Sequence, residues 1–223
     1  MSKASDQTGF SIGPASYVVK ERSLGATGRA GMNERDLISR SQSGDLQAFN
    51  DLVEIYQRSV YNLALRMLGS AETAEDATQD TFIAAYRGMA RFRGGSFKAW
   101  VFKIAANSCR DKMRSSRRAS VTSLDNLIEE AGDFIADDEA ESPEDFAERR
   151  ELGRLLSGSL SCLPEDQRLV VVLSDVQGLS YEEIAQVTGV SLGTVKSRLN
   201  RARSRLRDLL RQRRELLPPE FRQ

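Results

Sequence analysis

The stretch Ser180-Tyr-Glu-Glu-Ile-Ala185, then Gly189, then Ser191-Leu-Gly-Thr-Val-Lys196 carries the signals of two helices separated by a tight turn. Ser180 and Glu183 have the spacing of a capping box, in which a hydroxyl and a carboxylate satisfy each other's exposed backbone amides. Gly189 is typical of a helix end, and Ser191 is typical of a second helix start. Two capped helices joined by a short glycine-containing turn predict a helix-turn-helix.

The second of these helices has an apolar face and a basic face. Apolar residues recur in steps of three and four from Val195 to Leu209 and predict a buried stripe. The candidate DNA contacts at its start, on its outer face and on its flanks are Ser191, Thr194, Lys196, Ser197, Arg198, Asn200, Arg201 and Arg205. Such a face fits the major groove, where Arg reads guanine and neighbouring cations contact phosphates. A solvated helix in an ordinary bundle is the alternative, and the caps, turn and basic face together favour DNA.

The rest of the chain also has helical periodicity. Apolar residues at helical spacing follow Asp45 as far as Gly69, and Ser70 is a suitable cap for a helix to about Tyr86. After Gly94 and Gly95, a further helix is predicted over about 97–117. No segment alternates as a strand would. The predicted fold class is all-α, with two small helical domains joined by an acidic linker.

The charge distribution gives the domain boundaries. The chain carries 32 basic and 32 acidic side chains, but residues 119–148 contain eleven acidic and no basic ones. We therefore expect domains at 32–118 and 149–214, with an acidic flexible linker at 119–148. Residues 1–31 are predicted to be a disordered tail, and 215–223 a C-terminal tail. Both predicted domains carry a net positive charge, which is compatible with a polyanionic partner.

Composition removes several classes of function. The chain has no histidine and only two cysteines, Cys109 and Cys162, so a disulfide framework or a four-ligand zinc site is excluded. We expect both cysteines to be buried and structural. No apolar run is long enough for a membrane span or a secretory signal. The sequence predicts a cytoplasmic protein that is not an enzyme, with no cofactor, metal, membrane insertion or small-molecule substrate.

A second candidate surface precedes the predicted linker. On the helix from Phe97, polar and aromatic side chains form a stripe beside the predicted core positions Val101, Ile104 and Ala105, and a basic glycine loop precedes it. The residues of this surface are Phe92, Arg93, Ser96, Trp100, Lys103, Asn107, Arg110 and Arg114. An aromatic ring among amide and guanidinium groups suits an unpaired DNA strand, and the loop could receive an extruded base. A lone tryptophan is more often a core residue, and the pattern alone favours that reading.

A third surface lies on the preceding helix. Asp76, Gln79 and Asp80 lie beside Phe82, which predicts an acidic and apolar patch better suited to protein than to DNA. A solvated helix start, with acids stabilised by the helix dipole, explains the same residues equally well.

Two sets of motifs together resemble bacterial sigma factors. Their region two is similar to Ala74-Glu-Asp-Ala-Thr-Gln-Asp-Thr-Phe82, followed by Trp100, Ile104-Ala-Ala-Asn107 and Arg110-Asp111. Their region four is similar to Leu163-Pro-Glu-Asp-Gln-Arg168, Gly178–Ala185 and Gly193–Arg203. The short acidic linker between the regions resembles the extracytoplasmic-function (ECF) group. The resemblance covers about Asn33 to Leu210.

The resemblance implies a role for each surface. The polymerase patch would dock on a coiled coil of the largest subunit of core RNA polymerase. This patch consists of Asp76, Gln79, Asp80 and Phe82. The surface from Phe92 to Arg114, the downstream surface, would recognise and melt the downstream promoter element. The surface from Ser191 to Arg205, the upstream surface, would read the upstream element. The implied partners are core polymerase, promoter DNA and an anti-sigma factor. The alternative function is a free-standing helix-turn-helix regulator.

Overall fold

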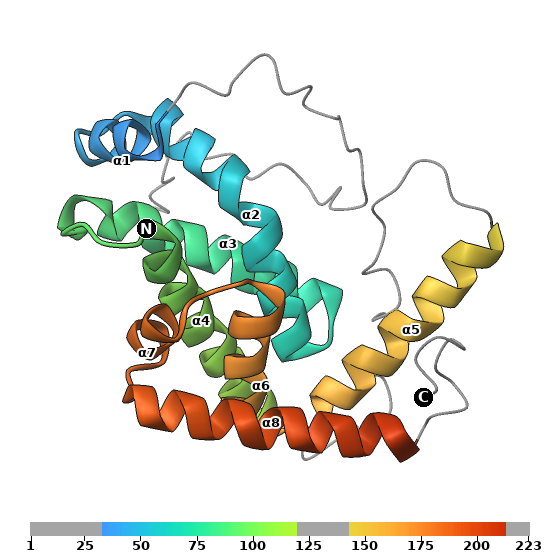
Figure 1. Ribbon diagram of the computed structural model, residues 1–223. Helices are drawn as coiled ribbons and strands as arrows, with labels where there is room; N and C mark the ends of the chain where they lie inside the picture. Colours follow the sequence, from blue (N-terminus) through green and yellow to red (C-terminus); the bar gives the residue numbers. More distant parts are fainter. Residues whose placement is uncertain (1–32, 120–142, 213–223) are drawn as a thin grey trace.

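The computed structural model describes residues 33–119 and 143–212, which form helices joined by short loops, with no strand among them (Figure 1). The tails predicted at 1–31 and 215–223, and residues 120–142 of the predicted linker, lie outside the described ranges. The N-terminal elements are α1 Glu34–Gln42, α2 Leu46–Leu68, α3 Ala71–Gly88, η1 Met89–Arg91 and α4 Phe97–Ala119. The C-terminal elements are α5 Pro143–Ser161, α6 Glu165–Val171, η2 Val172–Val176, α7 Tyr181–Thr188 and α8 Leu192–Gln212.

Side-chain caps position the helices of the N-terminal domain. Asp45 caps α2 by accepting a hydrogen bond from the Ala48 amide at 3.1 Å, and Arg40 binds the same carboxylate at 2.7 Å. The α2 helix ends at Gly69, whose left-handed φ of 79° is readily adopted only by glycine. Ser70 then caps α3 through the Thr73 amide. The predicted start and end of α2, and the cap of α3, are confirmed.

The helix-turn-helix is also confirmed. Ser180 accepts from the Glu183 amide at 3.2 Å, while Glu183 accepts from the Ser180 amide at 2.9 Å, which completes the capping box of α7. The α7 helix ends at Gly189, with φ of 71°, and the Ser191 hydroxyl accepts from the Thr194 amide at the start of α8. The start and end of α7, and the start of α8, therefore lie where local capping chemistry places them.

A π-helical turn, η2, orients α8 within the C-terminal domain. Asp175 on η2 accepts a hydrogen bond from Arg203 Nε of α8 at 3.0 Å. The Asp175 carboxylate is the main cause that raises the pKa of Arg203 above its ordinary value. Arg203 therefore stabilises the crossing of α8 over η2, and its guanidinium is turned away from the predicted upstream surface.

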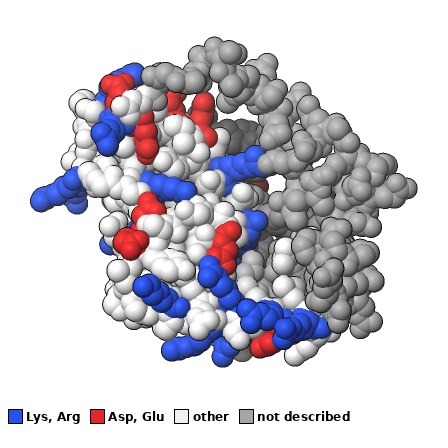
Figure 2. Space-filling model, viewed as in Figure 1, with Lys and Arg blue, Asp and Glu red and all other residues white. Residues whose placement is uncertain are grey.

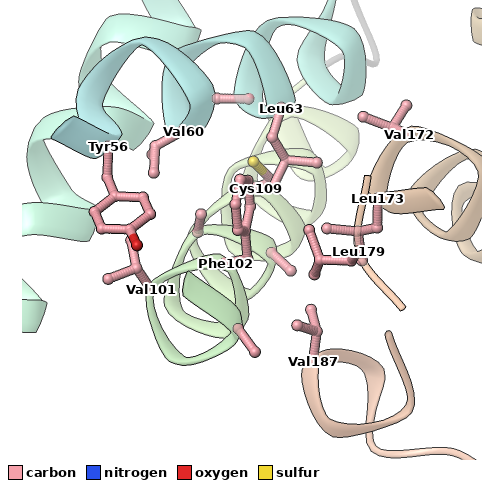
Figure 3. Packing of buried hydrophobic residues seen from close by; sticks show 14 of the residues in the cluster. Tyr56, Val60, Leu63, Val101, Phe102, Cys109, Val172, Leu173, Leu179 and Val187 are labelled. Carbon is pink, nitrogen blue, oxygen red and sulfur yellow. The ribbon is translucent and has the colours of Figure 1, made fainter. Parts of the chain in front are cut away.

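The two helical domains pack against each other and share one apolar core. Figure 3 shows Leu173, Leu179 and Val187 of the C-terminal domain pointing toward Phe102 and Cys109 of α4. All five side chains are at most 4% exposed. The acidic linker predicted between two domains thus joins two domains that are already in direct contact. Hydrophobic periodicity gave no sign of this contact, because it reports that a face is buried and not which element covers it.

Two other features differ from expectation. Helix α5 begins at Pro143, inside the range predicted as linker, where proline supplies a suitable first helical residue. Cys162 is exposed, with its thiol donating to the Gly158 carbonyl oxygen at 3.3 Å, so the prediction that both cysteines are buried is wrong for this residue. Cys109 is buried as predicted, and burial raises the pKa of its thiol to about 12.

The contrast between the two thiols predicts their reactivity. The thiolate is the reactive form, so Cys109, buried and with a raised pKa, should react slowly with a disulfide reagent. In the native chain we expect only the Cys162 thiol to react fast with the reagent. After denaturation, both thiols should react fast. Cys162→Ser should remove the fast phase. Two fast thiols in the native chain would contradict the packing around Cys109.

Candidate functional site

The upstream surface lies on α8, which is anchored by a buried stripe. Val195, Leu199 and Ala202 are at most 1% exposed, as the periodicity predicts. On the other side of the helix, Lys196, Asn200 and Arg201 are exposed. Figure 2 shows basic side chains gathered along the edge of the molecule that α8 forms in Figure 1. The structure therefore presents an outward row of basic and amide groups over a rigid helix.

Two predicted upstream contacts also bond to the neighbouring helix α6. Arg198 Nε lies 2.9 Å from Asp166 Oδ2, and Arg205 Nη1 donates to Gln167 Oε1 at 3.4 Å. Sequence reasoning missed Asp166 and Gln167, because their contacts with α8 span 32 or more positions of the chain. In this conformation Arg198 stabilises the domain rather than extending outward.

The start of α8 is held by short polar contacts. Ser191 and Thr194 hydroxyls lie 2.9 Å apart, and the Ser197 hydroxyl donates to the Thr194 carbonyl oxygen at 3.0 Å. These three predicted upstream residues thus satisfy one another or the local backbone. The exposed charged and amide side chains of the upstream surface are those of Lys196, Asn200, Arg201 and Arg205.

The downstream surface surrounds a pocket of about 240 Å³ between the glycine loop and α4. Arg93, Ser96, Trp100 and Lys103 line it, together with Gln186 from α7. Lys103, Asn107 and Arg114 are exposed at helical spacing along the same face of α4. The predicted loop and helix do form one concave polar surface. Gln186, which comes from the other domain, was not predicted.

An aromatic cluster lies beside this pocket, and two of its members, Phe92 and Trp100, line it. Phe92 packs against Phe97 and Trp100, with ring centroids 5.6 Å and 5.1 Å apart, and Phe92 is only 8% exposed. Phe92 is therefore largely buried against the aromatic rings of α4, although it also lines the pocket, and its contact with DNA stays a prediction. Trp100 is partly buried and also lines the pocket, so its ring has both a packing edge and an open edge. Gly88 lies directly beneath it, since a Cβ there would lie 3.3 Å from the Trp100 ring.

Ser96 and Arg110 of the downstream surface already have partners. The Ser96 hydroxyl caps α4 through the Ala99 amide and donates to Glu183 Oε1 at 2.7 Å. Arg110 lies 3.6 Å from Glu165 Oε1 and donates to Asn107 Oδ1 at 3.3 Å. The Ser96 hydroxyl and the Ser180 amide hold the pKa of Glu183 below its ordinary value. Glu183 and Glu165 belong to the C-terminal domain, so two downstream residues lie in the interface between domains.

The polymerase patch is acidic and exposed, but it has no phenylalanine on its surface. Asp76, Gln79 and Asp80 are exposed on α3, whereas Phe82 is 2% exposed and belongs to the core. The prediction of Phe82 as a surface residue is corrected: it lies on the face of α3 that packs into the bundle. Lys112 of α4 lies 3.6 Å from Asp76 Oδ2 and 3.0 Å from Asp80 Oδ2. This lysine was missed, because it reaches the acids from a different helix.

An apolar groove of about 210 Å³ was also missed. Its walls include Leu156 and Leu160 of α5, Val176 of η2 and Leu206 of α8. Leu156 and Val176 are 38% and 44% exposed, which is unusual for large aliphatic side chains. The sequence analysis singled out neither Leu156 nor Val176, because the groove forms only where α5 packs against α8.

Family models match both halves of the chain. A model described as Sigma-70 region 2 matches residues 52–119, and one described as Sigma-70, region 4 matches residues 154–206. The first covers α3 and α4, and the second covers the helix-turn-helix. Each predicted surface thus lies within a matched region.

Individual sigma factors are similar over most of the chain. The ECF RNA polymerase sigma factor SigE of Mycolicibacterium smegmatis is 39% identical over 165 residues, which are 74% of this chain and 62% of that protein. The RNA polymerase sigma-H factor of Pseudomonas aeruginosa is 37% identical over 175 residues, 76% of this chain and 90% of that protein. The ECF RNA polymerase sigma-E factor of Escherichia coli is 37% identical over 177 residues, 77% and 91% of the two chains.

Solved structures share the arrangement of helices. CnrH in complex with the cytosolic domain of CnrY has a TM-score of 0.59 and 28% identity, and covers 79% of this chain and 96% of that one. The sigma factor RpoE from Bartonella quintana, in complex with the anti-sigma factor NepR, has a TM-score of 0.60 and 28% identity. The match covers 74% of this chain and 98% of that one. With the motifs, the helix-turn-helix and both matched regions in agreement, this chain belongs to the sigma-70 family of RNA polymerase sigma factors, in its ECF group.

Proposed function

We propose that this chain binds core RNA polymerase, directs it to a class of promoters and helps to open the duplex there. The upstream surface on α8 reads one promoter element, and the downstream surface on α4 captures the unpaired strand at the other. The observation that carries the proposal is the pairing of an outward basic helix with a polar, tryptophan-lined pocket on one chain. Each surface alone would occur in many proteins, whereas the two together match both sigma regions.

The chain itself makes and breaks no bond under this proposal. Strand separation is driven by binding energy, because Trp100 and the polar groups of α4 interact with a base only after it leaves the duplex. Two modest DNA sites gain affinity when one polymerase holds both of them, since the second binding step becomes intramolecular. Among the residues that the structure describes, no helix is both long and apolar enough to span a bilayer.

The proposed partners follow from the two domains. Core polymerase contacts the exposed acids of α3, and promoter DNA contacts α4 and α8. An anti-sigma factor is expected as well, because the similar structures of CnrH and RpoE contain a second protein, described for RpoE as an anti-sigma factor. We place the chain in the cytoplasm, where polymerase and promoter DNA are found.

Run-off transcription tests the proposal directly. Purified core polymerase and a library of genomic fragments should yield discrete transcripts only when the chain is added. A chain that binds duplex fragments tightly as a dimer, with no transcript in the presence of core, would support a free-standing regulator instead.

Asn107 provides a test of strand capture. It is exposed on α4 beside the pocket, so Asn107→Ala should impair initiation on duplex promoter and spare initiation on a pre-melted template. Asn50→Ala on α2 makes the same chemical change outside the proposed surfaces and should affect neither template. Equal losses on both templates would show that Asn107 acts in folding or polymerase binding.

Arg201 and Arg205 separate sequence reading from general affinity. Arg201 is exposed opposite the buried stripe. Arg201→Ala should therefore reduce the discrimination between bases at one position of the upstream promoter element by about 1–3 kcal/mol of binding free energy. Arg205 is exposed further along α8, where it would meet phosphate and not a base edge, so Arg205→Ala should weaken all promoters alike and lower the salt slope by about one unit. Both variants are measured as holoenzyme on promoters with each upstream base varied, at two salt concentrations. A uniform loss with Arg201→Ala would show that α8 enters the groove at another angle.

Asp80 tests the polymerase patch. Asp80→Asn removes an exposed charge. In a competition assay it should lower the affinity of the chain for core polymerase about tenfold, or roughly 1.4 kcal/mol of binding free energy. Lys112→Gln removes the intramolecular cation near Asp80 but keeps both acids, so it should not reproduce this loss. Equal losses with the two variants would show that the ion pair maintains α3 and α4 and that Asp80 does not contact polymerase.

A further inference from the structure

We infer that helix α1 sets the shape of the downstream surface, and that Gln42 at its end is a positioning residue for the glycine loop, residues 92–96. The inference deepens the proposed function and rests on it for the meaning of the downstream surface. The match to Sigma-70 region 2 begins at residue 52, whereas α1 ends at Gln42, so the family match does not include this helix. The helix nevertheless contacts η1, the turn that leads into the glycine loop.

One side-chain hydrogen bond joins α1 to the glycine loop. Gln42 Nε2 donates to the Phe92 carbonyl oxygen at 2.6 Å, across 50 positions of the chain. The peptide that follows Phe92 is trans and planar, so its carbonyl and the Arg93 amide point in opposite directions. A bond that holds the Phe92 carbonyl therefore also fixes the direction of the Arg93 amide. Gln42 thus acts on the first peptide of the loop.

The glycine loop is short and has a second fixed point. The Ser96 hydroxyl accepts from the Ala99 amide at 3.1 Å and caps α4. Only Arg93, Gly94 and Gly95 lie between the two fixed points, and the φ angles of the glycines are 86° and 90°. Glycine adopts positive and negative φ about equally readily, so these residues alone do not select one path for the loop. The bond from α1 restricts the path at one end, as the cap does at the other.

The same loop forms part of the pocket wall. Arg93, both glycines and Ser96 line the cavity of about 240 Å³, together with Trp100 and Lys103 of α4. Rotation of the first peptide of the loop would move Arg93 and change the shape of the pocket. Pocket shape decides which extruded base is accepted. Gln42 is not itself a lining residue of this pocket, so its effect on base choice passes through the loop.

Helix α1 is held firmly enough to act as an anchor. Leu37 is 2% exposed and fixes the helix to the core. Arg40 Nη2 donates to Asp45 Oδ2 at 2.7 Å, and Asp45 also caps α2. At the first residue of α1, Glu34 Oε1 accepts from the Tyr56 hydroxyl of α2 at 2.7 Å. Because both ends of α1 are fixed to α2, the side chain at its last residue starts from a defined position.

The first end of α1 is also connected to the aromatic cluster beside the pocket. Tyr56, which donates to Glu34, packs against Phe97 with ring centroids 5.5 Å apart. Phe97 in turn packs against Phe92, whose carbonyl oxygen accepts the bond from Gln42. The two ends of α1 thus reach the same cluster, one through an aromatic ring and one through a carbonyl group. This double connection favours a positioning role over simple cover of the bundle.

Base discrimination tests the role of Gln42. Gln42→Glu keeps the shape of the side chain but replaces the donor with an acceptor, which repels the Phe92 carbonyl oxygen. Holoenzyme is measured on promoters in which each base of the downstream and upstream elements is varied. Discrimination at one downstream position should fall about fivefold, as expected for the loss of one ordinary hydrogen bond, and discrimination at the upstream element should stay unchanged. Gln47→Glu on α2 makes the same change outside the proposed surfaces and should alter neither.

Gln42→Lys separates the hydrogen bond from a general role in folding. Lysine keeps a donor on a longer, flexible side chain, so this variant should recover most of the discrimination that Gln42→Glu loses. Discrimination is a ratio between promoters, so the added charge of lysine cancels from it. Gln42 is exposed, and neither variant should change the helical circular dichroism. Unchanged discrimination in Gln42→Glu, an equal loss in both variants, or an equal loss at both promoter elements would overturn the inference.

Nuclear magnetic resonance of the free chain gives a readout without DNA. The Arg93 amide shares one peptide with the Phe92 carbonyl, so its resonance should move in Gln42→Glu, move back in Gln42→Lys and stay in place in Gln47→Glu. An unmoved Arg93 resonance in Gln42→Glu would overturn the inference. Run-off activity with unchanged base discrimination in Gln42→Glu overturns only this inference. No transcript from the unmutated chain, with the Arg93 resonance moved as expected, overturns only the proposed function.

Discussion

The packing of α4 against α7 is the contact on which the arrangement of the two proposed DNA-binding surfaces depends. Helix α4 packs on α2 and α3 of its own domain as well as on α7. Its side chains Phe102, Ala106 and Cys109 are at most 1% exposed. Burying α4 on two sides leaves only its polar stripe available for a partner. The same contact places Glu183 and Gln186 of α7 at the rim of the downstream pocket. Apolar burial, which is strong and non-directional, thus sets the position of groups that act through directional hydrogen bonds.

Local structure could be predicted well because its causes are local. The caps at Asp45, Ser70 and Ser180, and the helix ends at Gly69 and Gly189, each arise from residues within one turn. For the same reason the helix-turn-helix and the outward face of α8 followed from sequence. The pairing of motifs along the chain indicated the family, which no single surface could have done.

Features that depend on distant residues could not be predicted. Phe82 and Phe92 looked like surface groups beside polar neighbours, but their rings lie on faces that other helices cover. Arg198 and Arg205 looked free on α8, and their partners on α6 are far away in sequence. The helical period of α4 pointed to a narrow stripe, whereas the helix is buried on a wide face because two domains pack against it. Which element covers a face is decided by tertiary contacts, on which periodicity is silent.

Amide hydrogen exchange over α4 and α7 of the free chain measures the shared core most directly. If one core holds both domains, the amides of the buried segments of α4 and α7 should be strongly protected. Exchange in α7 as fast as in an isolated short helix would contradict the shared core.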